Sequence, residues 1–367
     1  MTWLRRWERE VTDTHVLAVI RIAMGGLLFL QALESARSLV EQGYFGNAFH
    51  MPFIPEAWVP SRSVYVAIVA ARVLVAMLVT AGHRARQALL ASALLGLYTL
   101  LCDRLSYHHN RYALFCFAFL LAFTPCDRTL AISPSFGDRV GPRWAVRIAQ
   151  LQVALIYFAS ASSKLVDPDW RSGGVILDRF LRYGGEALAK GVPPDVVEAF
   201  SQPVVTSALA KLAISTELFL AVAFFSRRLR IFALWWGLMF HLTIEVTSRV
   251  ELFTWLTLTT YAFFVTPDFR ARKLFFDPAR GKWLARVVKW LDWFARFDVR
   301  SWGPDHLRKG HAIVIIRRDG ARATGIRALV MIARCTPLLF PLWAPLALVA
   351  SFTAKKGAPE KTHETAK

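Results

Sequence analysis

Five residues with proton-carrying side chains are the strongest chemical candidates in this sequence. Tyr157 and Lys164 are seven positions apart, a spacing that puts both on one face of a helix. His108 and His109 are adjacent, and His241 lies in a later apolar segment. Desolvation at an apolar boundary favours the neutral amine of a lysine, which can take a proton from a weak acid. Histidines can then return protons or bind an anionic intermediate.

The same residues also have a structural interpretation. Lys164 precedes Leu165 and can be an ordinary anchor at a membrane interface. The histidines can be capped loop residues. Glu245 lies one helical turn after His241. Spacing alone therefore leaves open whether the group is catalytic or structural.

The elements that must position these residues are apolar blocks of membrane size. The chain has 367 residues, a formal charge of +19, 55% hydrophobic residues and only 19% charged residues. A helix needs about 20 apolar residues to cross a bilayer core. Eight blocks approach that length, at 16–33, 64–81, 87–101, 112–123, 144–162, 204–225, 230–247 and 251–266. A ninth block, 335–352, contains three prolines, which argue against a simple spanning helix.

The predicted fold class is therefore an all-α integral membrane protein. It is a polytopic bundle of about eight transmembrane helices, or nine if the last block spans, with a small basic cytoplasmic C-terminal region. Basic residues are denser in alternate loops, which predicts a multi-pass protein with both termini in the cytoplasm. This topology puts His109, Lys164 and the outer half of the His241 segment on the extracytoplasmic side.

Other functions find little support in the sequence. The positive charge is explained by loops that flank the membrane, so we expect no nucleic-acid partner. There is no His-Glu-x-x-His motif, Gly-x-Ser-x-Gly elbow or P-loop, and the four cysteines form no Cys-x-x-Cys pair. We therefore expect no metal, and membrane lipid as a partner.

Four further charged residues fall inside the predicted spans, where such groups are costly. Arg21 lies near an inner end and can reach the interface. Arg72 lies nearer mid-helix and calls for a buried partner. Lys211 and Glu217 are six positions apart, on different faces, and we expect both to be structural.

The predicted domain organisation has five parts. Residues 1–15 form a cytoplasmic N-terminal segment and 16–266 the transmembrane domain. Residues 267–300 combine aromatic and basic residues at helical spacing, which favours an amphipathic segment at the inner leaflet. Residues 301–354 form a small α+β or re-entrant region, with a turn at 318–320, and 355–367 a disordered tail.

The segment 147–173 resembles the signature of the vitamin K-dependent γ-glutamyl carboxylase family, whose bacterial branch comprises the horizontally transferred transmembrane (HTTM) domain proteins. The matching residues are Tyr157-Phe158, Lys164-Leu165, Asp169-Trp170 and Gly173. Residues 107–110, with Tyr-His-His-Asn, and 240–242, with Phe-His-Leu, match further family segments in the right order. Residues 21–25 resemble the family's opening helix, and the likeness covers about residues 10–270.

The resemblance implies a chemistry. A lysine at the Lys164 position would deprotonate reduced vitamin K or menaquinol, which reacts with oxygen to give a strong base. That base removes a γ-proton from a glutamate, and carbon dioxide adds to the carbanion. The candidate catalytic residues are then Lys164, His109 and His241, and the candidate substrate- or cofactor-binding residues are Tyr157, His108, Glu245 and Trp170. The implied location is a bacterial inner membrane.

The chain also departs from the carboxylases. Where the carboxylases carry a large lumenal domain after the membrane part, we expect about a hundred mostly basic residues inside the cell, which leaves peptide carboxylation open. The chain also has Ser163-Lys164 where they have a lysine pair. An alternative is a non-carboxylating factor that matures or exports a secreted peptide, as in the family's sporulation-delaying toxin maturation proteins. A scaffold or transporter without chemistry is a third. Residues 315–343 resemble the second half of DCC-type thiol–disulfide oxidoreductase domains, without their active Cys-x-x-Cys half.

Overall fold

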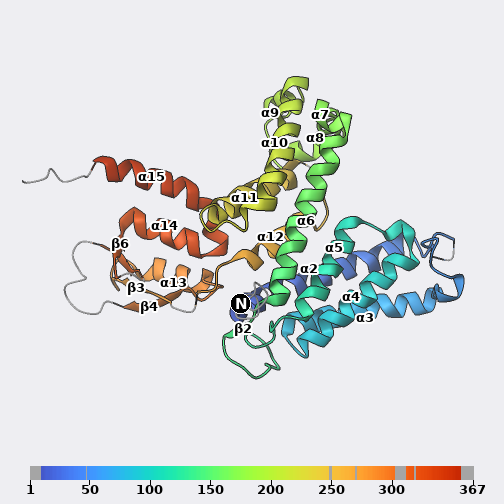
Figure 1. Cartoon of the computed structure of the whole chain (residues 1–367), viewed down its shortest axis with the longest axis horizontal. Coiled ribbons are helices and arrows are strands. Elements are labelled where there is room, and N and C mark those ends of the chain that lie inside the picture. The colour runs from blue at the N-terminus through green and yellow to red at the C-terminus, as the bar shows by residue number, and fades with distance from the viewer. Residues whose placement is uncertain are drawn as a thin grey trace, which may run out of the picture. The chain divides into compact units, whose positions relative to one another are not determined.

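The computed structural model describes residues 10–46, 48–247, 250–268, 271–301, 311–317 and 320–356. The chain divides into two compact units, Met1–Pro267 and Asp268–Lys367. Both units are shown in Figure 1. Parts of three predicted segments lie outside the described residues. They are Arg5, Arg6 and Arg9 of the expected N-terminal segment, residues 318 and 319 of the expected turn, and residues 357–367 of the expected tail.

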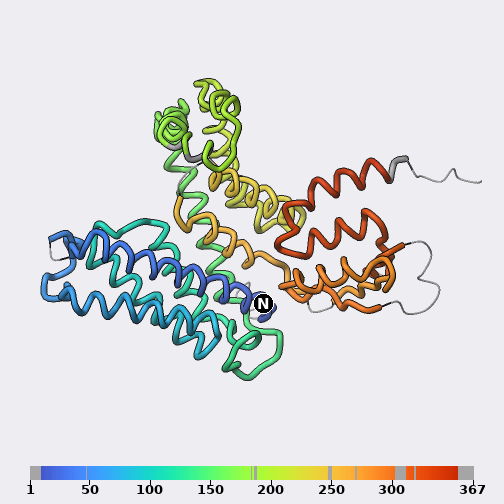
Figure 2. The backbone as a smooth tube through the Cα atoms, turned by 180° about the vertical axis from the view of Figure 1, so that it is seen from behind, coloured from blue at the N-terminus to red at the C-terminus, as the bar shows by residue number. Residues whose placement is uncertain are grey.

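The first unit is built almost entirely of helices. Its longer helices are α2 (Thr14–Glu41), α3 (Arg62–Ala81), α4 (Ala85–Cys102), α5 (His109–Ala122), α6 (Trp144–Val166), α8 (Gly174–Ala189), α10 (Pro203–Ala223) and α11 (Arg230–Thr247). Shorter elements are α7 (Pro168–Ser172), α9 (Pro194–Phe200) and α12 (Phe253–Tyr261), with 3₁₀ turns at Glu56–Trp58, Arg104–Ser106 and Ala262–Phe264. Helices α2 and α3 run side by side in both backbone views, and α6 packs against α10 (Figures 1 and 2).

Five described helices are long and apolar enough to cross a membrane, namely α2, α3, α4, α6 and α10. They correspond to five of the eight predicted blocks. The blocks at 112–123, 230–247 and 251–266 are also helical, but α5 has 14 residues and α12 only nine. At 1.5 Å per residue, α5 spans roughly 21 Å, less than a ~30 Å hydrocarbon core. The structure thus supports a helical membrane protein with five candidate spans in its described part.

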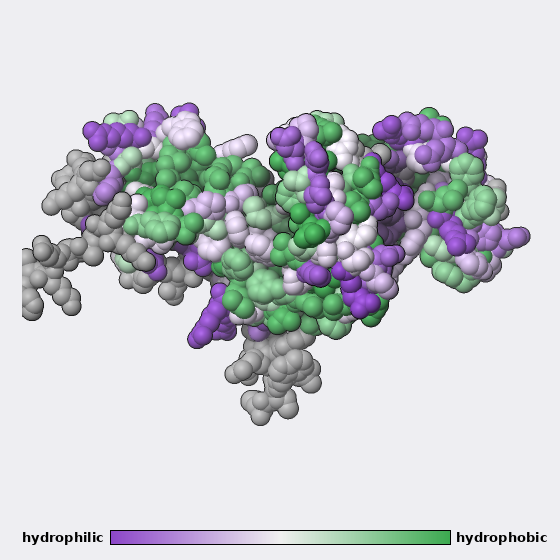
Figure 3. All heavy atoms as spheres, turned by 90° about the horizontal axis from the view of Figure 1, so that it is seen from above, coloured by the Kyte–Doolittle hydropathy of each residue, from purple (hydrophilic) through white to green (hydrophobic). Residues whose placement is uncertain are grey.

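The surface of these helices is suited to lipid. Leu74 on α3, Leu155 on α6 and Val222 on α10 are each more than half exposed. Figure 3 shows hydrophobic side chains, in green, covering large parts of the visible face. Soluble monomers rarely expose apolar patches of this extent, whereas lipid tails solvate them without penalty. The apolar helices therefore contact membrane lipid.

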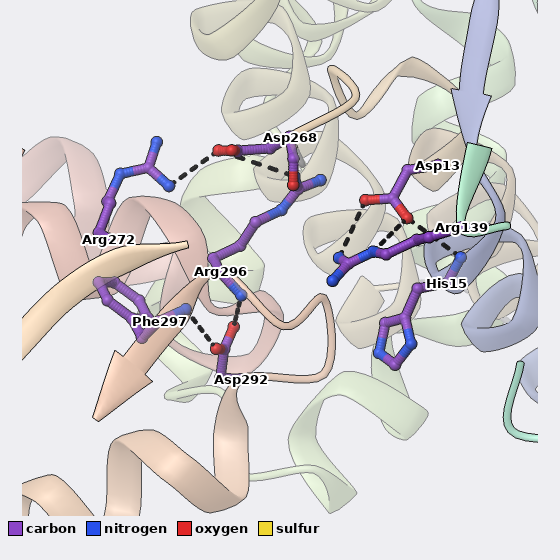
Figure 4. A network of polar contacts seen from close by, with 8 residues as sticks. All are labelled: Asp13, His15, Arg139, Asp268, Arg272, Asp292, Arg296 and Phe297. Atoms are coloured by element: carbon purple, nitrogen blue, oxygen red, sulfur yellow. Dashed lines mark hydrogen bonds and ion pairs between the residues drawn. The ribbon is translucent and has the colours of Figure 1, made fainter. Parts of the chain in front are cut away.

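The first unit contains a small two-stranded antiparallel sheet. Strand β1 (Val11–Asp13) pairs with β2 (Val140–Pro142). Asp13 caps α2 by accepting the His15 N–H, and its carboxylate pairs with Arg139 at 2.9 Å (Figure 4). Because Asp13 is buried, both partners are needed to satisfy its charge. The chain entering α2 is thereby tied to the chain entering α6.

The buried arginines of the spans have polar but neutral partners. Arg72 donates to the Thr99 hydroxyl at 3.0 Å and to the Gln31 amide oxygen. Arg21 donates to the carbonyls of Cys126, at 3.1 Å, and Leu130. These contacts agree with the structural interpretation of both residues. Lys211, also expected to be structural, is exposed on α10.

The second unit combines strands with helices, and two of its strands begin within residues 267–300, where the sequence predicted an amphipathic segment. It contains a four-stranded sheet of order β4-β3-β5-β6, formed by β3 (Arg272–Phe276), β4 (Phe297–Ser301), β5 (Ile313–Ile316) and β6 (Arg322–Thr324). Strand β3 is parallel to β4 and antiparallel to β5. The sheet carries helices α13 (Lys282–Leu291) and α14 (Gly325–Cys335), and Pro341 lies in a 3₁₀ segment before α15 (Trp343–Lys356).

The expected boundary at residue 300 therefore runs through this sheet. Strands from the 267–300 and 301–354 regions share one core, in which Leu274, Val288 and Ile315 are fully buried. Asp268 pairs with Arg272 at 2.9 Å and with Arg296 at 3.7 Å, which ties the two ends of the β3–α13–β4 crossover (Figure 4). The amphipathic pattern of 283–291 does form a helix, with Val288 on the sheet side.

Candidate functional site

A cavity of about 230 Å³ lies within the first unit. Four helices supply its walls: α5, α6, α10 and α12. The lining residues are His109, Asn110, Tyr112, Ala113, Phe117, Gln152, Val153, Ile156, Tyr157, Ser160, Glu217, Phe253, Leu256, Thr257 and Thr260. Two predicted site residues, His109 and Tyr157, are among them. Glu217, which the sequence did not assign to the site, also lines it.

Helix α6 presents Tyr157, Ser160 and Lys164 towards α10. The spacings of three and four residues place these side chains on one face, as the sequence predicted for Tyr157 and Lys164. Ala161 is fully buried on the same side and lets the two helices approach. Tyr157 is 5% exposed, so this part of the helix faces the interior.

Lys164 is held by three groups. Its Nζ donates to the Ser160 hydroxyl at 3.0 Å and to Glu217 Oε1 on α10. It also lies 4.7 Å from the centre of the Trp170 ring, in a cation–π arrangement. The Lys164 and Glu217 side chains are only 16% and 8% exposed. The amine therefore has a buried carboxylate beside it, which the sequence analysis did not assign to Lys164.

The sequence after Lys164 explains how Trp170 reaches it. Asp167 caps the short helix α7 by accepting the backbone N–H of Asp169 at 2.9 Å and of Trp170 at 3.4 Å. Pro168 occupies the first turn, where its missing N–H costs nothing. Gly173 ends the helix with φ +91°, and a Cβ there would overlap the backbone of Ser207 on α10.

Glu217 has an unsatisfied acceptor. Its Oε2 is buried and has no hydrogen-bond partner among the described residues. A buried carboxylate oxygen without a donor is costly, and such atoms call for an explanation. Because Glu217 lines the cavity, a donor on a bound molecule is a simple candidate for the missing partner.

His241 lies behind the cavity wall. Its Nε2 is 2.6 Å from the Tyr157 hydroxyl, which in turn is 2.5 Å from the Tyr261 hydroxyl. His241 is 1% exposed, and its Nδ1 has no hydrogen-bond partner in the described structure. Tyr157, which lines the cavity, is the hydrogen-bonded neighbour that connects His241 to it. The structure thus brings His241 and Tyr157 together as one buried polar group.

The two adjacent histidines divide their roles. His108 caps α5, its Nδ1 accepting the Asn110 N–H at 3.3 Å, and its ring stacks on His109 at 4.3 Å. His109 begins α5 and lines the cavity, outside the five candidate spans. Burial, and secondly the nearby His108, lower the pKa of His109 from its ordinary value of 6.5. His109 is therefore held in its neutral form, able to accept a proton.

Glu245 is the predicted residue that the structure leaves apart from this group. It is absent from the cavity wall, and its backbone carbonyl accepts a hydrogen bond from Lys190 Nζ at 2.5 Å. Trp170 does not line the cavity either, but it contacts Lys164.

Sequence reasoning missed Glu217, Ser160 and Tyr261. Ser160 could have been found from its position four residues before Lys164. Glu217 was noted for the high cost of a carboxylate within a span, but it was expected to be structural. Tyr261 carries no comparable signal.

The arrangement is suited to proton transfer. In the ranges that the structure describes, no three His, Cys, Asp or Glu side chains gather closely enough to hold a metal ion. The polar residues of the cavity wall include Glu217, whose other oxygen is bound to Lys164 outside the wall, together with His109 and Tyr157. Phe117, Val153 and Leu256 are among the apolar residues of its walls. Such a cavity can hold a largely apolar molecule with an acidic hydroxyl.

Comparison with known proteins identifies the family. A search of curated proteins and a search of solved structures gave no significant match. The family model described as HTTM domain matches residues 9–269, which is more than half of the chain and includes the whole cavity. The resemblance seen in the sequence is thereby confirmed at the level of the family, and the chain is a membrane protein that belongs to the HTTM-domain family.

Proposed function

We propose that the cavity binds a reduced quinone, such as reduced vitamin K or menaquinol, and that the Lys164–Glu217 pair accepts its hydroxyl proton. The observation that carries this proposal is the unsatisfied Oε2 of Glu217 in the cavity wall, with Lys164 bound to the other oxygen. A carboxylate oxygen can accept a hydrogen bond from a phenolic hydroxyl, which would satisfy the orphaned atom. The family resemblance independently favours a quinone.

The residues present fit such a ligand. The apolar wall, with Phe117, Ile156 and Phe253 among its members, suits a flat ring, and all four helices of the wall also contribute polar residues. When bound, a reduced quinone supplies a weakly acidic hydroxyl and can react with oxygen. Glu217 would hold that hydroxyl, and Tyr157 would contact the same ligand from α6.

Each side chain then has a defined role in moving a proton. Glu217 would accept the hydroxyl's hydrogen bond and then its proton on Oε2, and the Lys164 ammonium, hydrogen-bonded to Oε1, would balance the negative charge left on the ligand. Trp170 stabilises the lysine whenever it is charged. His109, neutral at the other side of the cavity, takes up or returns a second proton. His241 and Tyr261 fix the orientation of the Tyr157 hydroxyl.

The substrate that the activated quinone would act on is proposed from the family resemblance. Carbon dioxide addition to a glutamate of a secreted peptide fits a cavity that opens on the extracytoplasmic side of a bacterial inner membrane. The loop charges favour that orientation. The alternative, a factor that matures or exports a secreted peptide without carboxylating it, uses the same fold without the proton-transfer step.

The proposal is tested by supplying the quinol directly. The full-length protein in detergent is given reduced vitamin K or menaquinol with oxygen, and quinone epoxide is measured by liquid chromatography and mass spectrometry. Lys164→Ala is compared with Lys211→Ala, which removes an exposed lysine from α10. We expect epoxide from the native protein and from Lys211→Ala, and at least about a hundredfold less from Lys164→Ala.

The outcomes separate the two functions. Epoxide that depends on Lys164 supports the proton-transfer site and justifies a search for carboxylated glutamate peptides. No epoxide from folded native protein with either quinol overturns the proposal and favours the peptide-handling alternative. Equal epoxide from native protein and Lys164→Ala overturns the role of the lysine.

A further inference from the structure

A cluster of three arginines lies at the end of the bundle where α6 begins. Arg143 immediately precedes α6, Arg147 lies in its first turn, and Arg230 is the first residue of α11. Arg147 and Arg230 are close enough to Arg143 to disfavour its positive charge. We call Arg143, Arg147 and Arg230 the arginine cluster. It is separate from the cavity described above, whose wall includes none of the three.

The cluster is short of negative charge. Within the described residues, one carboxylate pairs with it: Glu10 Oε2, 2.5 Å from Arg147 Nη2 and 3.9 Å from Arg143 Nε. The hydrogen bonds of Arg230 go to uncharged acceptors, among them the Phe224 carbonyl at 2.7 Å. One carboxylate against three guanidinium groups leaves two positive charges in excess. Like charges held this closely repel one another unless an anion joins them.

Arg143 is the least satisfied member. Its side chain is only 12% exposed, and its Nε is buried with no hydrogen-bond partner in the part of the chain that the structure describes. Burial, and secondly Arg147, lower the pKa of Arg143 to about 10. A guanidinium presents five N–H donors in a planar fork that matches phosphate oxygens. The unsatisfied Nε of Arg143 and the excess positive charge of the cluster together point to a missing oxyanion.

The surroundings identify the depth at which that oxyanion would lie. Span α6 begins at Trp144, and span α10 ends at Ala223, two residues before Phe225. Trp144, Phe225 and Leu229 are each more than a third exposed around the cluster. Exposed tryptophan and apolar residues beside arginines at the ends of spans are typical of the level of lipid headgroups.

We propose that Arg143, Arg147 and Arg230 bind the phosphate of an anionic phospholipid headgroup, with Trp144 and Phe225 contacting the start of its acyl chains. A lipid satisfies both halves of the site, because its phosphodiester meets the guanidinium groups and its tails meet the exposed apolar residues. A free phosphate would satisfy only the first half. A zwitterionic lipid would bring its own positive charge to an already cationic site.

The proposal is tested by native mass spectrometry of the full-length protein in detergent. The protein is titrated with phosphatidylglycerol or phosphatidylcholine, each alone and with excess inorganic phosphate. Arg143→Gln is compared with Arg84→Gln, which makes the same charge change at an exposed loop position between α3 and α4. Arg143→Lys keeps the charge and provides a second variant if Arg143→Gln does not fold. Gel filtration and thermal melting check each variant.

We expect the native protein and Arg84→Gln to retain phosphatidylglycerol at roughly tenfold lower concentration than phosphatidylcholine. Arg143→Gln should lose most of that preference and Arg143→Lys part of it, because lysine cannot form the planar fork. Inorganic phosphate should not displace the lipid. Equal retention of both lipids by the native protein, or an equal loss in Arg84→Gln, overturns the site. Displacement by inorganic phosphate would assign the cluster to a soluble phosphate and overturn the lipid.

Discussion

Lys164 on α6 and Glu217 on α10 form a hydrogen-bonded ion pair across 53 positions of sequence. Both side chains are largely withdrawn from solvent. Desolvating two charges is costly, and their attraction repays the cost only when both partners are present. The pair therefore ties the two helices together and also leaves one carboxylate oxygen unsatisfied in the cavity wall.

Removing only one partner should destabilise the protein strongly. Glu217→Gln leaves the Lys164 ammonium buried without a counter-charge, and we expect a loss of roughly 3–5 kcal/mol of stability. The double variant Lys164→Met with Glu217→Leu removes both charges and should recover most of that loss without recovering quinol epoxidation. Thermal melting in detergent measures the first effect. A double variant no more stable than Glu217→Gln would show that the two residues are not coupled.

The cap of α7 gives a milder test of how Trp170 is positioned. Asp167→Ala removes the acceptor for the Asp169 and Trp170 N–H groups and should cost about 1 kcal/mol. Asp167→Asn can retain the cap and serves as the matched control. If the cap holds Trp170 over Lys164, its loss should also lower quinol epoxidation, whereas the asparagine variant stays close to native. Equal epoxidation by both variants would show that the Asp167 cap does not contribute to the position of Trp170 over Lys164.

Helix periodicity made part of the site predictable. Tyr157 and Lys164 share a face of α6 in the structure because residues seven apart complete two helical turns. The partners of these residues come from other helices, whose rotation about their own axes depends on packing. The pairing of Lys164 with Glu217 and of Tyr157 with Tyr261 could not be read from the sequence for that reason.

Pairing between segments that are far apart in sequence also explains why the C-terminal sheet was not predicted. The strand at 272–276, Arg-Lys-Leu-Phe-Phe, is short and begins with two basic residues, and its parallel partner begins at Phe297. Between the two strands lies a helix with a strong amphipathic pattern, in which Val288 is on the buried face. That pattern led to the prediction of an amphipathic segment over residues 267–300. Parallel pairing always needs such a crossover, so its strands are separated in sequence.

The Tyr157 hydroxyl is the link between His241 and Tyr261. Tyr157→Phe leaves both neighbouring groups without this partner, whereas Tyr261→Phe preserves the 2.6 Å contact between Tyr157 and His241. Each buried polar group left unsatisfied costs roughly 1–3 kcal/mol. We therefore expect Tyr157→Phe to lower the melting temperature more than Tyr261→Phe. The reverse order would mean that Tyr261, rather than Tyr157, anchors the network.

The stacked histidines predict a pH dependence. Burial and the neighbouring His108 lower the pKa of His109 below 6.5, so the unfolded chain binds this proton more readily than the folded protein. The contribution of His109 to stability is therefore present above pH 6.5 and is lost as the pH falls through the unfolded pKa towards the lower folded value.

His108→Asn tests the electrostatic part of that effect. An asparagine at the N-cap can still accept the Asn110 N–H, so α5 keeps its cap while the second ring is removed. Nuclear magnetic resonance of histidine labelled with ¹⁵N should show the pKa of His109 rising towards 6.5 without reaching it, because burial remains the larger cause. An unchanged pKa in a folded variant would assign the whole effect to burial. A rise to 6.5 would assign it to His108.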